Sequence, residues 1–181
     1  MYEVFGFYKF TKINFLKKKQ NILKEFLNKK NIRGTIILSK EGLNGTISGK
    51  QKEIKLTINK LKKLLKIKDF DSHNISKSSF QPFHRPKVKI KKEVVPMNLL
   101  LKKKLNKNNY INPNKWNKLI SNEKTLLIDV RKPFEHEVGT FKGAINPNIN
   151  NFRDFPKYLK KIKKERPIAM FCTGGIRCEK A

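Results

Sequence analysis

The sequence predicts an α/β protein of two domains, an α+β first domain with the element order βαββαβ and a second domain with parallel strands. Two observations carry this prediction. In residues 1–80, apolar positions switch between strand-like alternation and helical spacing. In residues 111–181, the continuous apolar runs TLLIDV and PIAMF are typical of buried parallel strands. A length of 181 residues accommodates two small domains.

The first domain is predicted one element at a time. EVFGFYKF is a strand, and the apolar residues between Asn14 and Asn31 recur at helical spacing. RGTIILS and NGTISG are β-rich runs joined around KEGLNG, a hairpin in which Gly42 and Gly45 are expected to supply the turn conformations. The apolar spacing in residues 54–65 predicts a second amphipathic helix, and SHNISKSS a final strand. This order predicts a ferredoxin-like sandwich, an antiparallel sheet with two helices on one face.

Residues 81–110 are expected to form a basic strand and linker between the domains. Val88, Ile90 and Val94 alternate with lysines, which predicts a half-buried strand with a basic outer face. LLLKKKLNKNN then follows as a solvated connector.

The second domain is predicted over residues 111–181. NPNKWNKLI is expected to be a short helix with Trp116 as its apolar anchor, followed by the strand TLLIDV and a helix over residues 152–164. PIAMF is the next strand, and Cys172 lies just past its carboxyl end. Ligand sites of open α/β sheets are found at that edge.

Charge and composition narrow the class of protein. The net charge is +29, and of the 43 basic residues 37 are lysine and six arginine. Such a surface attracts phosphate backbones, although asparagine and isoleucine are also abundant, so a genome rich in A/T codons is an alternative explanation. The sequence shows no signal peptide, no apolar run of about 20 residues and only two cysteines. These features predict a soluble cytoplasmic protein.

The loop CTGGIR after the last strand is the candidate site. Its glycines let backbone N–H groups turn inward to form an anion-binding nest around Cys172, and the following helix and Arg177 favour the thiolate. The Cys-x4-Arg spacing encloses less space than the Cys-x5-Arg loop of cysteine phosphatases, so it suits a persulfide or similar small group better than a phosphate monoester. The alternative is a buried structural cysteine beside a glycine turn. The predicted anion-binding loop comprises Thr173, Gly174, Gly175, Ile176 and Arg177.

Five segments of the chain together resemble the rhodanese-domain tRNA uridine hydroxylases: EGLNGTISG, PFHRPKVKIKKE, LIDVRKPFEHEVGTFKGAINP, FRDFP and CTGGIRCEKA. The resemblance implies an acylphosphatase-like, ferredoxin-like domain followed by a rhodanese-like domain. It also implies oxygen-dependent hydroxylation of the wobble uridine, position 34 of tRNA, to 5-hydroxyuridine, with O2 as co-substrate. Cys172 matches the rhodanese-type cysteine that carries a persulfide.

The resemblance also points to supporting residues. Asp129 and Arg131 match the D-x-R that closes the first rhodanese strand; the alternative is structural, an aspartate capping a turn and an arginine tying loops together. Cys178 could resolve an oxidised Cys172 through a disulfide, or could point elsewhere from the start of the next helix. Glu135 and the neighbouring histidine are left without a role.

The tRNA anticodon loop is the expected partner. The predicted tRNA-binding residues are Arg85, Lys87, Lys89 and Lys91, supported by Arg33 and the first-domain lysines, with simple solvation as the alternative. A wobble base is single-stranded and could stack on an aromatic side chain. The aromatic residues near this segment are Phe80, Phe83 and Tyr110.

No cofactor or metal is predicted. The two cysteines and His73, His84 and His136 lack the spacing of zinc ligands, and the sequence has no flavin, haem or iron motif. In the family the chain continues beyond CEKA, so the rhodanese-like domain is expected to be incomplete. A fragment, a domain completed by a second polypeptide and a decaying gene are the alternatives. Alternative functions are a sulfurtransferase using a Cys172 persulfide and a non-catalytic RNA-binding remnant.

Overall fold

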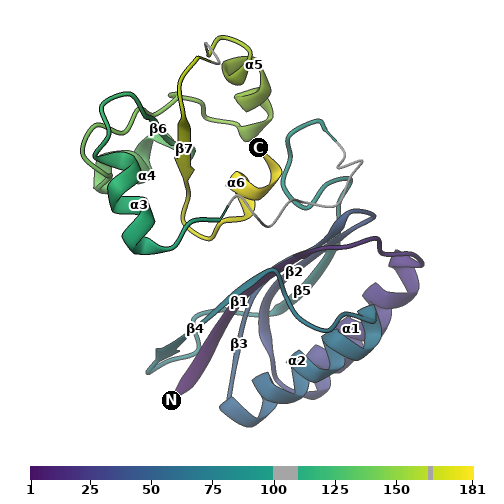
Figure 1. The fold of residues 1–181 in the computed structure, drawn as a ribbon. Coiled ribbons are helices and arrows are strands. Elements are labelled where there is room, and N and C mark those ends of the chain that lie inside the picture. The colour runs from purple at the N-terminus through teal and green to yellow at the C-terminus, as the bar shows by residue number, and fades with distance from the viewer. Residues whose placement is uncertain (100–109, 163–164) are drawn as a thin grey trace. The chain divides into compact units, whose positions relative to one another are not determined.

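The computed structural model describes residues 1–99, 110–162 and 165–181, which divide into two compact units, Met1–Val94 and Val95–Ala181 (Figure 1). The first unit confirms the predicted βαββαβ order and adds a fifth strand, with the sheet order β4-β1-β3-β2-β5. Its elements are β1 Tyr2–Phe10, α1 Leu16–Lys29, β2 Arg33–Ser39, β3 Gly42–Gly49, α2 Gln51–Leu65, β4 Ser72–Ser78 and β5 Pro86–Ile90.

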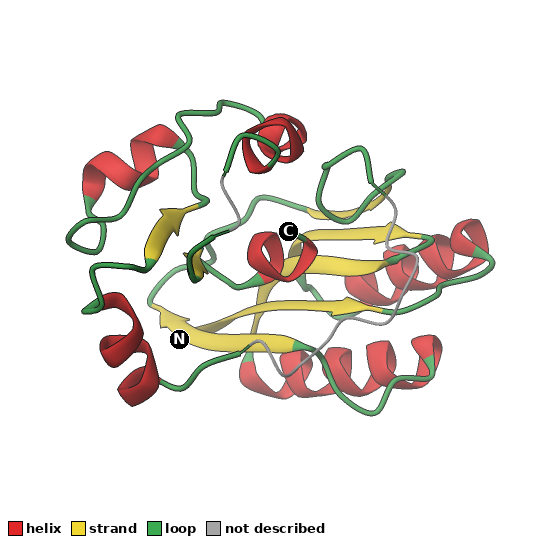
Figure 2. Ribbon diagram, turned by 45° about the horizontal axis from the view of Figure 1, so that its top comes forward, coloured by secondary structure: helices red, strands yellow, loops and turns green. Residues whose placement is uncertain are grey.

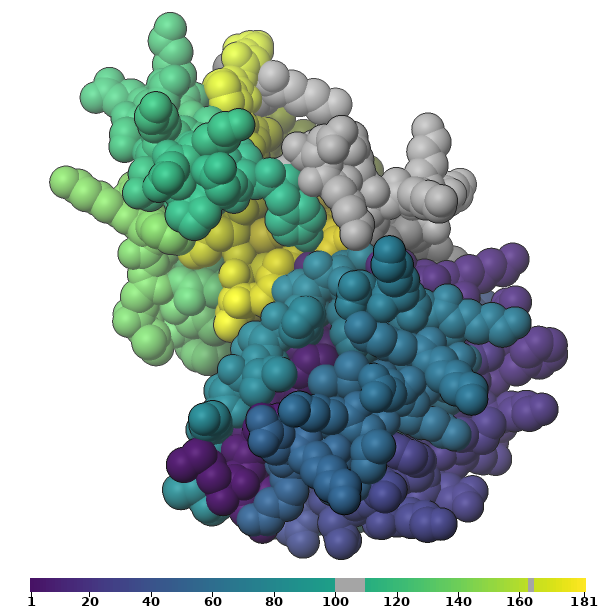
Figure 3. All heavy atoms as spheres, turned by 60° about the horizontal axis from the view of Figure 1, so that its bottom comes forward, coloured from purple at the N-terminus to yellow at the C-terminus, as the bar shows by residue number. Residues whose placement is uncertain are grey.

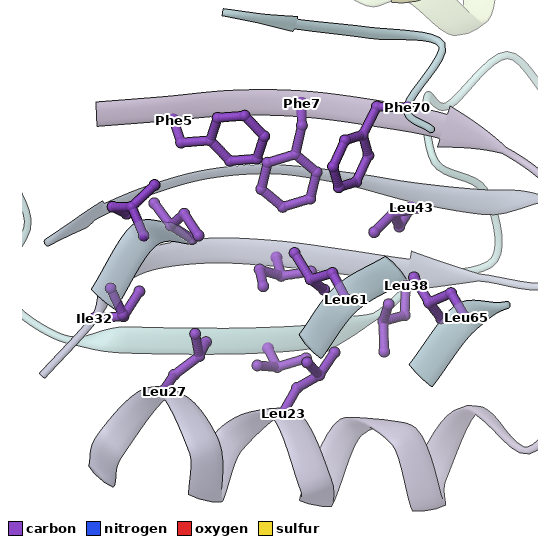
Figure 4. Packing of buried hydrophobic residues seen from close by; sticks show 14 of the residues in the cluster. Phe5, Phe7, Leu23, Leu27, Ile32, Leu38, Leu43, Leu61, Leu65 and Phe70 are labelled. Carbon is purple, nitrogen blue, oxygen red and sulfur yellow. The ribbon is translucent and has the colours of Figure 1, made fainter. Parts of the chain in front are cut away.

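The core of the first unit lies between the sheet and its two helices. Both helices cover the same face of the sheet (Figure 2). Leu23 and Leu27 from α1 and Leu61 from α2 point at the sheet, where Phe5 and Phe7 project from β1 (Figure 4). All five side chains are almost completely buried, and each contributes about 1.5–3 kcal/mol to folding. The amphipathic spacing read from the sequence therefore creates the core.

The hairpin between β2 and β3 differs from the prediction in one residue. Its turn consists of residues 40–41, and Gly42 begins β3 with a φ of +153°. The prediction that Gly45 supplies a turn conformation is wrong, because this residue lies inside β3. A Cβ at Gly45 would lie 2.9 Å from both the Phe7 ring and the Thr35 carbonyl oxygen. Glycine is needed there for close packing rather than for turning the chain.

The basic strand expected in the junction is β5, and it belongs to the first sheet. It runs parallel to β2 at the sheet edge. Val88 is buried, and its carbonyl accepts a hydrogen bond of 2.7 Å from the buried side chain of Gln20. Val94 is also buried, whereas Ile90 remains 37% exposed. The first unit thus extends to Val94, beyond the predicted end at residue 80. Most of the expected connector, residues 100–109, lies outside the described residues.

The second unit contains a two-stranded parallel sheet, β6-β7, which confirms the two predicted parallel strands. The helix predicted over residues 152–164 is shorter, because α5 ends at Leu159 and the N–H groups of Lys161 and Ile162 bond to carbonyls three residues earlier, as in turns. Residues 163–164 of the predicted helix lie outside the described residues. The elements are α3 Pro113–Ile120, β6 Leu126–Asp129, α4 Pro133–Val138, η2 Phe152–Asp154, α5 Phe155–Leu159, β7 Ile168–Phe171 and α6 Ile176–Lys180.

A small apolar cluster forms the core of the second unit. Its buried members are Met97, Leu126, Ile128, Val130 and Phe155, and the two cysteines pack against it. Trp116, the predicted anchor of α3, packs its ring 5.7 Å from that of Phe141 and 6.2 Å from that of Phe171. In the part of the chain that the structure describes, no helix has the length and apolarity needed to cross a membrane.

Candidate active site

Cys172 lies immediately after β7, at the carboxyl end of the parallel sheet. The loop that follows β7 leads into α6 (Figure 1). The Gly175 N–H donates a hydrogen bond of 3.1 Å to the Cys172 sulfur. Gly175 adopts a φ of +82°, which glycine reaches without the steric cost of a side chain. The backbone N–H groups of Gly174, Arg177 and Cys178 also donate to this sulfur. The predicted nest is therefore wrapped around the sulfur atom of Cys172 itself.

The hydrogen-bond donors around the Cys172 sulfur stabilise its thiolate form. The pKa of Cys172 is lowered to about 5, first by a hydrogen bond from the Cys178 side chain and then by the backbone N–H groups, although burial opposes this shift. A thiolate is the nucleophilic form of cysteine. Cys172 is therefore ionised and reactive at neutral pH.

Cys178 faces Cys172 from α6. Its thiol donates a hydrogen bond to the Cys172 sulfur, and the pKa of Cys178 is raised by that bond, by burial and by the neighbouring negative charge. Both residues are free cysteines and both are partly exposed. Of the two alternatives open from the sequence, the structure has the one in which the side chains meet. At neutral pH the pair is one thiolate and one thiol.

Glu135 holds the loop in place from α4. Its carboxylate accepts two hydrogen bonds from the Arg177 guanidinium, at 2.9 and 3.0 Å, and one of 2.7 Å from the Thr173 hydroxyl. The pKa of Glu135 is lowered to about 2, chiefly by the bonds from Arg177. Arg177 also hydrogen-bonds the Cys172 sulfur. Sequence reasoning left Glu135 without a role, because 42 residues separate it from Arg177.

Asp129 and Arg131 stabilise the end of β6. Asp129 is fully buried and accepts hydrogen bonds from the Arg131 backbone and guanidinium at 2.7 to 3.0 Å and from the Thr140 hydroxyl at 3.0 Å. Burial alone would raise the pKa of Asp129, but the bonds from Arg131 lower it. Arg131 also donates to the Gly139 carbonyl and lies 5.5 Å from the centre of the Phe171 ring. The pair ties the loop after β6 to β7.

Two further contacts anchor α6. Lys180 is buried, and its ammonium group donates a hydrogen bond of 2.7 Å to the Val95 carbonyl. The Tyr110 hydroxyl donates a hydrogen bond of 2.8 Å to Glu179. The helix that carries Cys178 is therefore held at its far end as well as at the loop. Among the expected stacking residues, Tyr110 and Phe80 are exposed.

The predicted tRNA-binding residues Arg85, Lys87, Lys89 and Lys91 are all exposed. Lys87 pairs with Thr35, and Lys89 with Ile37, so both lysines lie on the sheet face opposite the helices. Further lysines project from the helices, where purple and blue side chains stand out from the surface in Figure 3. The exposed lysines of α1 and α2 are Lys17, Lys18, Lys24, Lys29, Lys52, Lys55 and Lys63. Within the described ranges, no group of three or more His, Cys, Asp or Glu residues could hold a metal ion.

The fold and the site together define a class of protein: a ferredoxin-like unit with a rhodanese-type unit, in which a thiolate follows a parallel strand. Residues 2–94 match the UPF0176 acylphosphatase like domain, and residues 112–181 match the rhodanese-like domain. The chain belongs to the UPF0176 acylphosphatase-like family and carries a rhodanese-like domain.

Two named relatives are similar over nearly the whole chain. A tRNA uridine(34) hydroxylase of Pelagibacter ubique (strain HTCC1062) is 66% identical over 181 residues, all of this chain. A tRNA uridine(34) hydroxylase of Bartonella quintana (strain Toulouse) is 41% identical over 187 aligned positions, which include 99% of this chain. The chain spans 60% of the length of each relative. The alternatives raised for the end of the chain stay predictions.

Proposed function

We propose that this protein hydroxylates the wobble uridine, position 34 of tRNA, to 5-hydroxyuridine, with O2 as co-substrate and Cys172 as the reactive residue. The observation that carries the proposal is the 66% identity over the whole chain to a protein named tRNA uridine(34) hydroxylase. The thiolate loop supplies a reactive group, and the charge of +29 supplies attraction for tRNA. The proposed location is the cytoplasm, where tRNA is used in translation.

A wobble uridine lies in a single-stranded loop, so no base pair has to open before the base reaches a protein residue. The proposed contact surface is the basic edge of the first sheet, formed by Arg33, Lys87 and Lys89, whose side chains alternate with buried ones along β2 and β5. Phosphate contacts of this kind position an RNA without reading its sequence.

Nucleoside mass spectrometry tests the proposed reaction. The 181-residue chain is expressed in cells that lack wobble-uridine hydroxylation, and 5-hydroxyuridine is measured in their tRNA. We expect the modified nucleoside with the wild-type chain and its loss with Cys172→Ser. A folded, soluble wild-type chain that produces no 5-hydroxyuridine would reject the proposal. If tRNA binding then survived in both chains, the RNA-binding remnant would be favoured.

A charge-swap pair tests the proposed tRNA surface. The double variant Lys87→Glu/Lys89→Glu alters the sheet face, and Lys52→Glu/Lys55→Glu makes the same charge change on α2. If the sheet face binds tRNA, only the first variant makes the negative slope of log affinity against log salt shallower, by about 0.7–0.9 for each lost phosphate contact. Equal losses in both variants would show that the charge attracts tRNA without a defined surface.

A rhodanese-type sulfurtransferase is the second candidate function. It is favoured by the match of residues 112–181 to the rhodanese-like domain and by the four-residue spacing between Cys172 and Arg177. In this function Cys172 would carry a persulfide and pass its outer sulfur to an acceptor. Transfer of sulfur from thiosulfate to cyanide, abolished by Cys172→Ser, supports this candidate, particularly if no 5-hydroxyuridine is formed.

A further inference from the structure

The side chains of the two cysteines of this chain face each other. Both the thiol and the backbone N–H of Cys178 donate to the Cys172 sulfur. The Gly175 N–H reaches the same sulfur at 3.1 Å, so the loop is closed tightly around it. Both cysteines pack against the same apolar cluster of the second unit. Gly175 lies between the two cysteines in a left-handed conformation, directly before α6 begins.

Two sulfur atoms in hydrogen-bond contact are placed for a disulfide. A disulfide requires Cβ atoms about 3.5–4.5 Å apart, and the hydrogen bond between the two side chains brings their sulfur atoms close together. Packing against the apolar cluster of the second unit partly buries the pair, while both cysteines retain partial exposure for an incoming thiol. The anchors of α6, at Lys180 and Glu179, hold Cys178 opposite Cys172.

The two cysteines differ in chemical character. Cys172 is the thiolate and Cys178 the thiol, so an external thiol that attacks the disulfide at Cys178 releases the better leaving group, Cys172. The hydrogen bonds to the Cys172 thiolate stabilise the reduced pair, as in strongly oxidising dithiols. The disulfide would therefore be readily reduced by ordinary cellular thiols. This pair suits repeated oxidation and reduction better than a permanent structural bond.

Hydroxylation by O2 requires two electrons beyond those of the substrate. We propose that Cys172 and Cys178 supply these electrons, passing from dithiol to disulfide once in each turnover. The inference rests on the function proposed above. In the balanced reaction, uridine, O2 and two thiols give 5-hydroxyuridine, water and one disulfide. The O–O bond breaks, one oxygen enters the C5–H bond, and the other leaves as water with the two thiol protons. An external thiol then restores the pair.

A single-turnover experiment tests the electron supply. The reduced chain is freed of reductant under anaerobic conditions and mixed with unmodified tRNA and dissolved O2. We expect at most one 5-hydroxyuridine per chain, matched one to one by an intramolecular disulfide, and further product when dithiothreitol is added. Cys178→Ser keeps a hydrogen-bond donor beside Cys172 but cannot form the disulfide, so it should yield little product. More than one product per wild-type chain without reductant, or a full yield from Cys178→Ser, would overturn the proposal.

A redox titration separates this inference from the proposed function. The chain is equilibrated with reduced and oxidised glutathione, alkylated, and weighed by mass spectrometry. We expect a wild-type species with two hydrogens fewer and no alkylation, whereas Cys172→Ser and Cys178→Ser form only mixed disulfides with glutathione. If the disulfide forms but the wild-type chain makes no 5-hydroxyuridine, the proposed hydroxylation and its electron supply fail, and only the redox pair stands. If both thiols remain open to alkylation under oxidising conditions, the pair is overturned even where hydroxylation is observed.

Discussion

Replacing Cys178 by alanine should raise the pKa of Cys172. The largest single cause of the low value, about 5, is the hydrogen bond from the Cys178 side chain. A hydrogen bond to a charged group is worth about 1.5–3 kcal/mol, and 1.36 kcal/mol corresponds to one pKa unit. We therefore expect a rise of about one to two units, to a pKa of about 6–7 in Cys178→Ala. At pH 6 the thiolate fraction would fall about two- to tenfold.

The pH profile of alkylation by iodoacetamide measures this shift. Cys178→Ala and Cys178→Ser each retain Cys172 as their only thiol, so the rate reports on one group. Serine keeps a donor, and its profile should have a lower midpoint than that of alanine. Coincident midpoints in the two variants, near pH 5, would mean that the backbone N–H groups alone ionise Cys172. The account of the thiolate–thiol pair would then be wrong.

Three further predictions concern stability. Glu135→Gln removes a carboxylate whose pKa is lowered to about 2. The charged carboxylate stabilises the fold fully above its unfolded pKa of about 4.3 and progressively less below it. In urea unfolding followed by Trp116 fluorescence, the free energy of unfolding of the variant should therefore be lower than that of wild type at pH 6 and approach it towards pH 2. Asp129→Asn should cost about 1.5–3 kcal/mol in the same assay, because Arg131 loses a buried charged acceptor; an unchanged midpoint would contradict this. Leu23→Ala should cost about 2–5 kcal/mol, measured by circular dichroism in denaturant, since Leu23 is fully buried; a cost below 1 kcal/mol would mean that the first core repacks freely.

Local patterns in the sequence were sufficient for most of the fold. The helix spacing over residues 54–65 and the apolar run at residues 126–129 each reflect the face that the element buries, so their type and position could be predicted. The position of Cys172 after β7 followed from the same logic. Gly45 was misassigned because glycine serves both turns and close cross-strand packing, and only the neighbouring strands show which applies.

The contacts that complete the site depend on residues distant in the sequence. Glu135 reaches Arg177 across 42 positions, and no local pattern encodes that pairing. The orientation of Cys178 depends on where α6 begins, and a shift of one residue would turn its side chain by about 100°. Sequence reasoning therefore located the reactive cysteine but left its main hydrogen-bond partner undecided.

The place of β5 in the first sheet decides how this protein can be dissected. The Gly34 N–H donates to the Arg85 carbonyl, and the Lys91 N–H donates to the Leu38 carbonyl, so β5 covers the backbone groups along the outer side of β2. A fragment cut at residue 80 would leave those groups bare, and exposed strand edges pair with one another. Such a fragment should self-associate, whereas one that ends at Val94 keeps β2 paired and has as its edge the short β5, whose proline and lysines disfavour edge-to-edge pairing. The smallest first-domain fragment that should remain monomeric therefore includes the basic strand β5.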